Sequence, residues 1–186
     1  MHKTQLASLL APLALPLAAL LSACAAPMMM KTFSQDGLPD AVRVPAGNKV
    51  ALETVGVGRI TYECRAKAGA SDVFEWVFVG PDAVLNSRSG AAMGRYYGPP
   101  ATWESSDGSK ITGAQLAVAP GGAGNIPLQL VKANPAVGKG AMEGVSHIQR
   151  VATQGGVAPA SACVAAGVGK REVVNYQADY IFWKAS

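Results

Sequence analysis

The sequence predicts an all-β domain, either an antiparallel β-sandwich or a barrel-like sheet, behind a separate N-terminal segment. Apolar residues recur with a period of two, in short runs that are rich in β-branched and aromatic side chains. Glycine, proline, aspartate and asparagine separate these runs, as turns between strands require. No stretch longer than about ten residues carries an apolar stripe at helical spacing. These patterns favour many short strands over helices.

The first strands are predicted between residues 49 and 79. Side chains alternate in character along residues 50–54 and again along 60–64. Phe74, Trp76 and Phe78 then share one face of a third run, because every second side chain of a strand points the same way.

The second half of the domain continues the pattern. Asp107-Gly108 is a strong tight-turn signal, with Trp103 before it and Ile111 after it. Gly121-Gly122 and Gly155-Gly156 indicate later loops. Further strands are therefore predicted at residues 110–118, 126–132, 145–153 and 172–183.

The N-terminus has the form of a lipoprotein signal. A basic start at Lys3 is followed by an uncharged apolar run over residues 6–21 and then by Ser22-Ala23-Cys24. A cysteine directly after small residues indicates acylation of Cys24 and cleavage before it. The alternative is an ordinary signal peptide cut nearby. The apolar run contains two prolines and is shorter than the about 20 residues of a membrane span.

This interpretation divides the chain into three parts and predicts its cellular location. Residues 1–23 are the signal peptide, 24–45 are a lipidated tether without clear periodicity, and 46–186 are the β domain. The chain is expected to be exported and held to a membrane by its lipid. Because Ala25 rather than aspartate follows Cys24, we expect the outer membrane, with the domain facing the periplasm or the cell surface.

Composition excludes several classes of function. The net charge of +4 is spread without a basic run, so nucleic acid binding has no support. His147 is the only histidine after the signal, which argues against a multi-histidine metal site. No acidic loop suited to calcium is present. We therefore predict neither a metal nor a cofactor.

The cysteines left after lipidation form one pair. Cys64 and Cys163 would lie in an oxidising compartment, where a disulfide is the natural state. The alternative is two buried free thiols. No Cys-x-x-Cys motif points to redox catalysis.

Three side chains are candidates for catalysis. Glu104 and Asp107 are close in sequence beside Trp103, as paired carboxylates of a glycan hydrolase could be. The simpler interpretation is that Asp107 begins a turn and Glu104 is a solvated strand residue. His147 could act as a base, although a lone strand histidine is more often structural. No nucleophile elbow for a serine triad is present.

The segment from Arg95 to Trp103 is the main candidate for binding. Arg95, Tyr96, Tyr97 and Trp103 combine aromatic faces with polar groups, which suits a glycan or a protein partner. The pattern favours the simpler interpretation, in which Trp103 and one tyrosine fill the core while the prolines shape a loop. Farther along, Gln149, Arg150 and Thr153 are expected to be structural, for example by bonding loop carbonyls.

A set of short motifs, taken in order, resembles a known family. They include Ile60-Thr61-Tyr62-Glu63-Cys64, Trp76-Val77-Phe78, Thr102-Trp103-Glu104, Ile148-Gln149-Arg150-Val151 and the closing run Tyr176-Gln177-Ala178-Asp179-Tyr180-Ile181-Phe182. This sequence is similar to the domain of unknown function 3455 family of secreted bacterial and fungal proteins. The resemblance implies an exported domain with a paired Cys64 and Cys163, and it implies no catalytic residue.

Some fungal members of that family carry a malate dehydrogenase label, which this sequence does not support. A dinucleotide site needs Gly-x-Gly-x-x-Gly between a strand and a helix. Gly56-Val57-Gly58 leads into another predicted strand, and Gly122-Ala123-Gly124 leads to Pro127. We therefore expect a non-enzymatic, lipid-anchored domain that binds a ligand or partner or serves the envelope structurally. The alternative is an envelope hydrolase that uses Glu104, Asp107 or His147.

Overall fold

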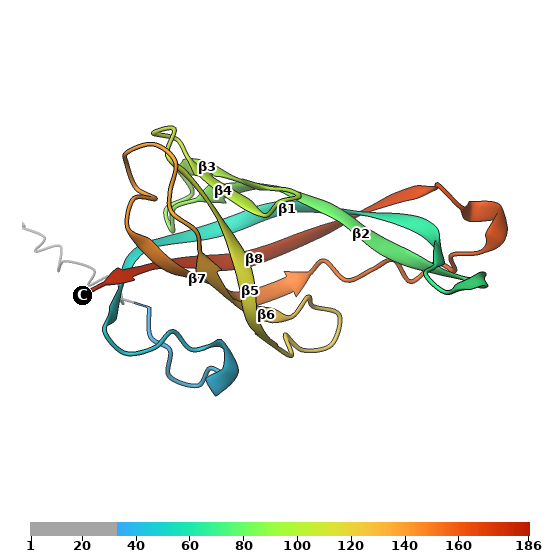
Figure 1. Cartoon of the computed structure of the whole chain (residues 1–186), viewed down its shortest axis with the longest axis horizontal. Helices are drawn as coiled ribbons and strands as arrows, with labels where there is room; N and C mark the ends of the chain where they lie inside the picture. Colours follow the sequence, from blue (N-terminus) through green and yellow to red (C-terminus); the bar gives the residue numbers. More distant parts are fainter. Residues whose placement is uncertain (1–32) are drawn as a thin grey trace, which may run out of the picture. The chain divides into compact units, whose positions relative to one another are not determined.

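A computed structural model describes residues 33–186 as one antiparallel sheet closed into a barrel (Figure 1). Eight strands follow one another around it in chain order, each paired with the next, and β8 pairs back with β1. The strands are β1 (Asn48–Lys67), β2 (Ala70–Asn86), β3 (Ala92–Tyr97), β4 (Thr102–Ser105), β5 (Lys110–Ala119), β6 (Leu128–Ala133), β7 (Val145–Gly155) and β8 (Arg171–Ala185). The all-β prediction is confirmed, and of the two architectures the chain forms the barrel.

Two glycines explain why the first predicted runs form one long strand. Gly56 and Gly58 resemble turn residues in sequence, yet both lie within β1. A Cβ at Gly56 would stand 2.5 Å from a ring carbon of Tyr180, and one at Gly58 would stand 2.2 Å from the carbonyl oxygen of Asp82. Glycine is needed there because neighbouring strands approach too closely for a side chain.

The short strands β3 and β4 were not among the predicted strands. They form a hairpin whose register places Tyr96 opposite Trp103 and Arg95 opposite Glu104. Both are brief, and β3 contains Gly94, so the period-two signal is weak. Their pairing with β2 and β5 nevertheless completes the barrel.

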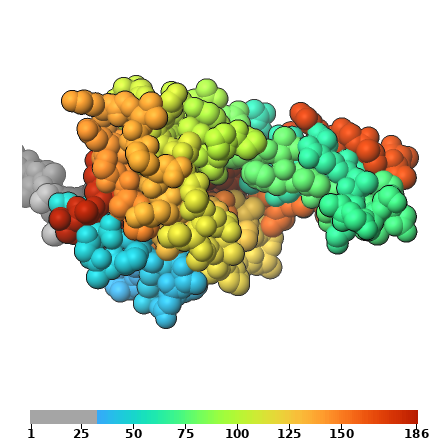
Figure 2. All heavy atoms as spheres, viewed as in Figure 1, coloured from blue at the N-terminus to red at the C-terminus, as the bar shows by residue number. Residues whose placement is uncertain are grey.

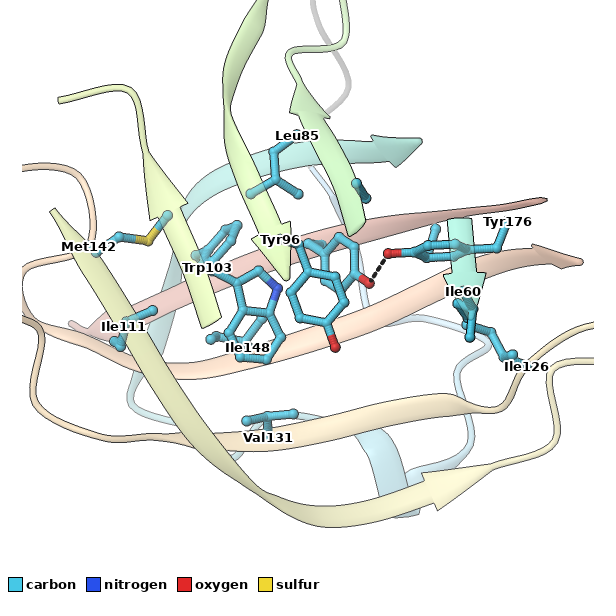
Figure 3. Packing of buried hydrophobic residues seen from close by; sticks show 14 of the residues in the cluster. Ile60, Leu85, Tyr96, Trp103, Ile111, Ile126, Val131, Met142, Ile148 and Tyr176 are labelled. Atoms are coloured by element: carbon cyan, nitrogen blue, oxygen red, sulfur yellow. Dashed lines mark hydrogen bonds between the residues drawn. The ribbon is translucent and has the colours of Figure 1, made fainter. Parts of the chain in front are cut away.

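The interior of the barrel is filled by a cluster of apolar side chains rich in aromatic rings (Figure 3). Tyr96, Trp103 and Tyr180 pack together, with ring centroids 4.8 to 6.0 Å apart. Tyr180, Phe182 and Ile148 are entirely buried. This is the main hydrophobic core, and burial of such large rings dominates its stability.

A second cluster lies on the outer face of the sheet, beneath the segment that leads into the barrel. Val42 and Val44 of this segment are buried against Leu130, Val151 and Ile181. The segment contains a short 3-10 helix, η1 (Asp40–Val42). Packing therefore begins ahead of residue 46, the predicted start of the domain. The predicted signal peptide, Cys24 and residues 25–32 of the predicted tether lie outside the described residues.

Three strands continue beyond the barrel as an arm. The end of β1 and the starts of β2 and β8 extend together away from the closed part (Figure 1). Cys64 of β1 is joined there to Cys163 by a disulfide, with a Cα–Cα distance of 5.4 Å. The predicted pairing is confirmed, and the alternative of two free thiols is wrong. Within residues 33–186, no helix has the length and apolar character to cross a membrane.

Candidate ligand-binding site

A pocket of about 380 Å³ opens through the side of the barrel between β2 and β5. It exists because β2 pairs with β3 only over Asp82–Asn86, and β5 pairs with β4 only over Lys110, Ile111 and Thr112. Figure 2 shows a hollow here, between the green atoms of β2 and the yellow atoms of β5. The pocket is lined by Phe78, Tyr96, Ala101, Trp103, Gly113, Gln115, Gln129, Val131 and Arg150. Its volume is in the range of small-ligand sites, roughly 300–1,000 Å³.

Two aromatic rings from the β3–β4 hairpin form one wall of the pocket. Tyr96 and Trp103 face each other across the strands and stack, with ring centroids 4.8 Å apart and planes inclined by 22°. Figure 3 shows the two rings side by side in the interior. Trp103 is only 1 % exposed and Tyr96 only 5 %. Strand alternation turns both rings inward, so the interpretation that Trp103 and one tyrosine fill the core is confirmed, and the two rings do not form an exposed patch.

The indole nitrogen of Trp103 has no hydrogen-bond partner among residues 33–186. The other two indoles of the chain are satisfied: Trp76 donates to the carbonyl oxygen of Ser161 and Trp183 donates to Gln149. A buried donor left unpaired costs about 1–3 kcal/mol. Trp103 therefore offers an unused donor beside the pocket, and an acceptor held there would remove the cost.

Arg150 of β7 supplies a positive charge in the lining of the pocket. Its Nε and Nη2 atoms donate to the carbonyl oxygen of Pro127 at 3.1 and 3.0 Å, which fixes the guanidinium and matches the predicted structural role. No ion pair of the described residues includes Arg150. The pocket lining contains no carboxylate. The guanidinium therefore keeps an uncompensated charge facing an uncharged lining.

Burial and the charge of Arg150 both shift the pKa values of the interior tyrosines. Burial raises the pKa of Tyr96, Tyr176 and Tyr180, and the positive charge of Arg150 opposes part of that rise. The hydroxyls of Tyr176 and Tyr180 lie 3.2 Å apart within hydrogen-bond distance (Figure 3). All three rings are therefore neutral near pH 7, and none can act as a base there.

Arg95, Tyr97 and Glu104 lie on the outer face of the same hairpin. The Tyr97 hydroxyl donates to Oε2 of Glu104 at 2.7 Å, and the Arg95 guanidinium lies 5.8 Å from the centre of the Tyr97 ring. Arg95 also pairs with Asp82 at 3.3 Å. Arg95 and Glu104 line a shallow surface groove of about 430 Å³. They are thus separated from Tyr96 and Trp103 by the thickness of the sheet.

Asp107 has the turn role that was the simpler interpretation. Its carboxylate accepts hydrogen bonds from the backbone and hydroxyl of Ser109 and from the backbone of Ala141. Bonds to Ser109 come first among the causes that lower its pKa from 3.8 to about 2. A carboxylate that is ionised at neutral pH and accepts these hydrogen bonds is suited to holding the β4–β5 turn against the loop before β7.

His147 lies apart from these carboxylates on β7. It is buried, and its Nδ1 atom lies 3.1 Å from the hydroxyl of Ser146. Burial, and secondarily the charge of Lys132, lowers its pKa. His147 makes no hydrogen bond to Glu104 or Asp107. Glu104 is instead bonded to Tyr97, Asp107 to Ser109, and His147 to Ser146. The three catalytic candidates therefore do not form a common site, and no metal-binding cluster of His, Cys, Asp or Glu occurs in the part of the chain described.

Sequence reasoning singled out Tyr96 and Trp103 but missed the other residues that line the pocket. Phe78, Gln115 and Gln129 come from separate strands, and Arg150 was assigned only a structural role. Gln129 and Arg150 are paired across β6 and β7, and Gln129 donates to Gln115 at 2.6 Å. The one signal in the sequence was the repeated polar character within otherwise apolar strands. That signal gives no indication of which side chains meet.

The fold and the pocket define a class: an eight-stranded antiparallel barrel with a lateral opening lined by aromatic and donor groups. Within that class the chain belongs to the family described as protein of unknown function (DUF3455), whose model matches residues 45–184. No curated protein and no solved structure matches the chain. The predicted family is confirmed.

Proposed function

We propose that this protein is an exported, lipid-anchored binding protein that holds a small molecule in the lateral pocket of its barrel. The observation that carries the proposal is the unpaired indole nitrogen of Trp103 beside a pocket of about 380 Å³. A buried polar group without a partner is rare in folded proteins and often indicates a missing one. The scattered Glu104, Asp107 and His147 give no corresponding support to a hydrolase.

Export and lipidation of Cys24 complete the proposal. The disulfide between Cys64 and Cys163 supports export, because such bonds persist in oxidising compartments. Cells fed an alkyne-tagged fatty acid should label the wild-type protein, whereas Cys24→Ser should abolish labelling and release the protein from membranes. Equal labelling of both proteins would contradict lipidation at Cys24.

Binding can be tested by NMR, because the three indoles give three separate N–H signals. The full chain carrying Cys24→Ser would be titrated with benzoate, cyclohexanecarboxylate, glucose and N-acetylglucosamine. We expect at least one probe to shift the Trp103 indole signal saturably while the Trp76 and Trp183 signals stay in place.

A pocket-blocking variant provides the control. Ala101→Leu adds bulk to the lining, whereas Ala92→Leu makes the same change in the outer groove. We expect Ala101→Leu to abolish the shift and Ala92→Leu to preserve it. If no probe shifts the Trp103 signal, or if both variants behave alike, the pocket is not the site.

A further inference from the structure

We infer that the ligand is a small organic monocarboxylate, recognised through its carboxylate by Arg150 and the indole N–H of Trp103. This inference rests on the proposed function and names the chemical class that the pocket accepts. Its basis is the match between one fixed cation, one unused donor and an otherwise aromatic and apolar lining.

The charge of the pocket selects an anion. Arg150 is the only ionised residue in the lining, and no carboxylate balances it there. Its bonds to Pro127 use Nε and Nη2, and Nη1 makes no hydrogen bond within residues 33–186. A single guanidinium neutralises one negative charge, which suits a monoanion better than a phosphate with two charges. A planar carboxylate also fits the donor geometry of guanidinium.

The donor at Trp103 selects an acceptor. Indole N–H can only donate, so an amine or another donor brought to the pocket would leave it unpaired. Trp103 and Arg150 lie in the lining of the same pocket, on β4 and β7. A carboxylate carries two acceptor oxygens, one for each of these donors.

The rest of the lining indicates that the part of the ligand beyond its carboxylate is apolar. Phe78, Tyr96 and Trp103 present aromatic surface, with Ala101 and Val131 beside them. Phe78 is 51 % exposed at the mouth, although it packs edge-on against Tyr62. A ring or short hydrocarbon placed against Phe78 would bury the part of that side chain that is now in water.

Three probes of the same shape test the charge: benzoate, benzamide and benzylamine, titrated into the full chain carrying Cys24→Ser. We expect benzoate to shift the Trp103 indole signal with a Kd roughly tenfold below that of benzamide, the factor that 1.4 kcal/mol produces. Benzylamine should not shift it. Because these comparisons use one protein, they do not depend on whether any variant folds.

Variants then assign the charge to its residue. Arg150→Gln should bring the Kd of benzoate to that of benzamide, Arg150→Lys should retain part of the difference, and Arg95→Gln on the outer face should leave it unchanged. Equal affinity of benzoate and benzamide in the unsubstituted pocket would overturn the carboxylate inference and leave the binding function standing. If benzoate, benzamide and benzylamine all fail to shift the Trp103 signal while glucose or N-acetylglucosamine shifts it, the carboxylate inference fails and the binding function stands. If no probe of either set shifts it, the proposed function itself fails.

Discussion

The Tyr97 hydroxyl donates a hydrogen bond of 2.7 Å to the carboxylate of Glu104, on the outer face of the β3–β4 hairpin. This hydrogen bond gives a structural partner to Glu104, which the sequence analysis named as a candidate for catalysis. The partner of Glu104 is a neighbouring tyrosine, while the pocket lies on the other side of the sheet behind Tyr96 and Trp103. Alternation along β3 and β4 therefore places Tyr97 and Glu104 on the outer face of the sheet and turns Tyr96 and Trp103 toward the pocket.

Replacing Glu104 should affect Tyr97 and leave the pocket unchanged. The hydrogen bond to Glu104 is the first cause that raises the pKa of Tyr97 above 10.0. Glu104→Gln should lower that pKa toward 10.0, as measured by following the Tyr97 ring signals between neutral and alkaline pH. The Trp103 indole signal and its response to benzoate should not change. Loss of benzoate binding in this variant would contradict the separation of the two faces.

Asp107 should make the protein sensitive to acid. Its folded pKa of about 2 lies below its ordinary value of 3.8. Its contribution to stability is therefore present above pH 3.8 and is lost as the pH falls toward 2. Asp107→Asn should lower the melting temperature at neutral pH and flatten the decline in that acidic window. Thermal melts from pH 6 to 2 would check this, and parallel curves for both proteins would contradict it.

His147 should add a second, milder dependence on pH. Burial, and then the nearby Lys132, lowers its pKa below 6.5. As the pH falls through 6.5, the unfolded chain takes up a proton before the folded chain does, so stability declines. His147→Gln should remove this part of the decline, and Lys132→Gln should move the pKa of His147 upward. An NMR titration that places this pKa at or above 6.5 would contradict the argument.

Gln149 should hold the leading segment to the barrel. It is entirely buried, accepts from the Trp183 indole at 2.8 Å and donates to the carbonyl oxygen of Val42 at 2.6 Å. Gln149→Leu should cost about 1–3 kcal/mol of unfolding free energy for each partner left unpaired. Denaturant unfolding would measure this loss.

Trp183→Phe provides the matched control for Gln149. It removes the indole donor, so the cost of Gln149→Leu should be smaller in that background. Strictly additive losses would show that the bond between the two side chains is not responsible. Protease cleavage within residues 33–44 should also be faster in Gln149→Leu.

The disulfide should stabilise the domain through the unfolded chain. Cys64 and Cys163 are 99 residues apart in sequence. Closing a loop of that length contributes up to about 4–5 kcal/mol by the chain-entropy argument. The double variant Cys64→Ala/Cys163→Ala should unfold at lower denaturant, and a reducing agent should destabilise the wild type but not the variant. An unchanged midpoint in both comparisons would contradict this role.

The sequence by itself determined the all-β class, the family, the cysteine pair and the turn role of Asp107. These features depend on local pattern, such as alternation along a strand or an Asp-Gly turn, which is readable without knowing what lies opposite. The tertiary structure alone decided which tyrosine joins Trp103 in the core, that Arg150 lines the same pocket from β7, and that β2 and β5 leave an opening. These relationships depend on strand register and on closure of the barrel from β2 to β7. The residues involved are distant in sequence, so no local pattern predicts that they come together.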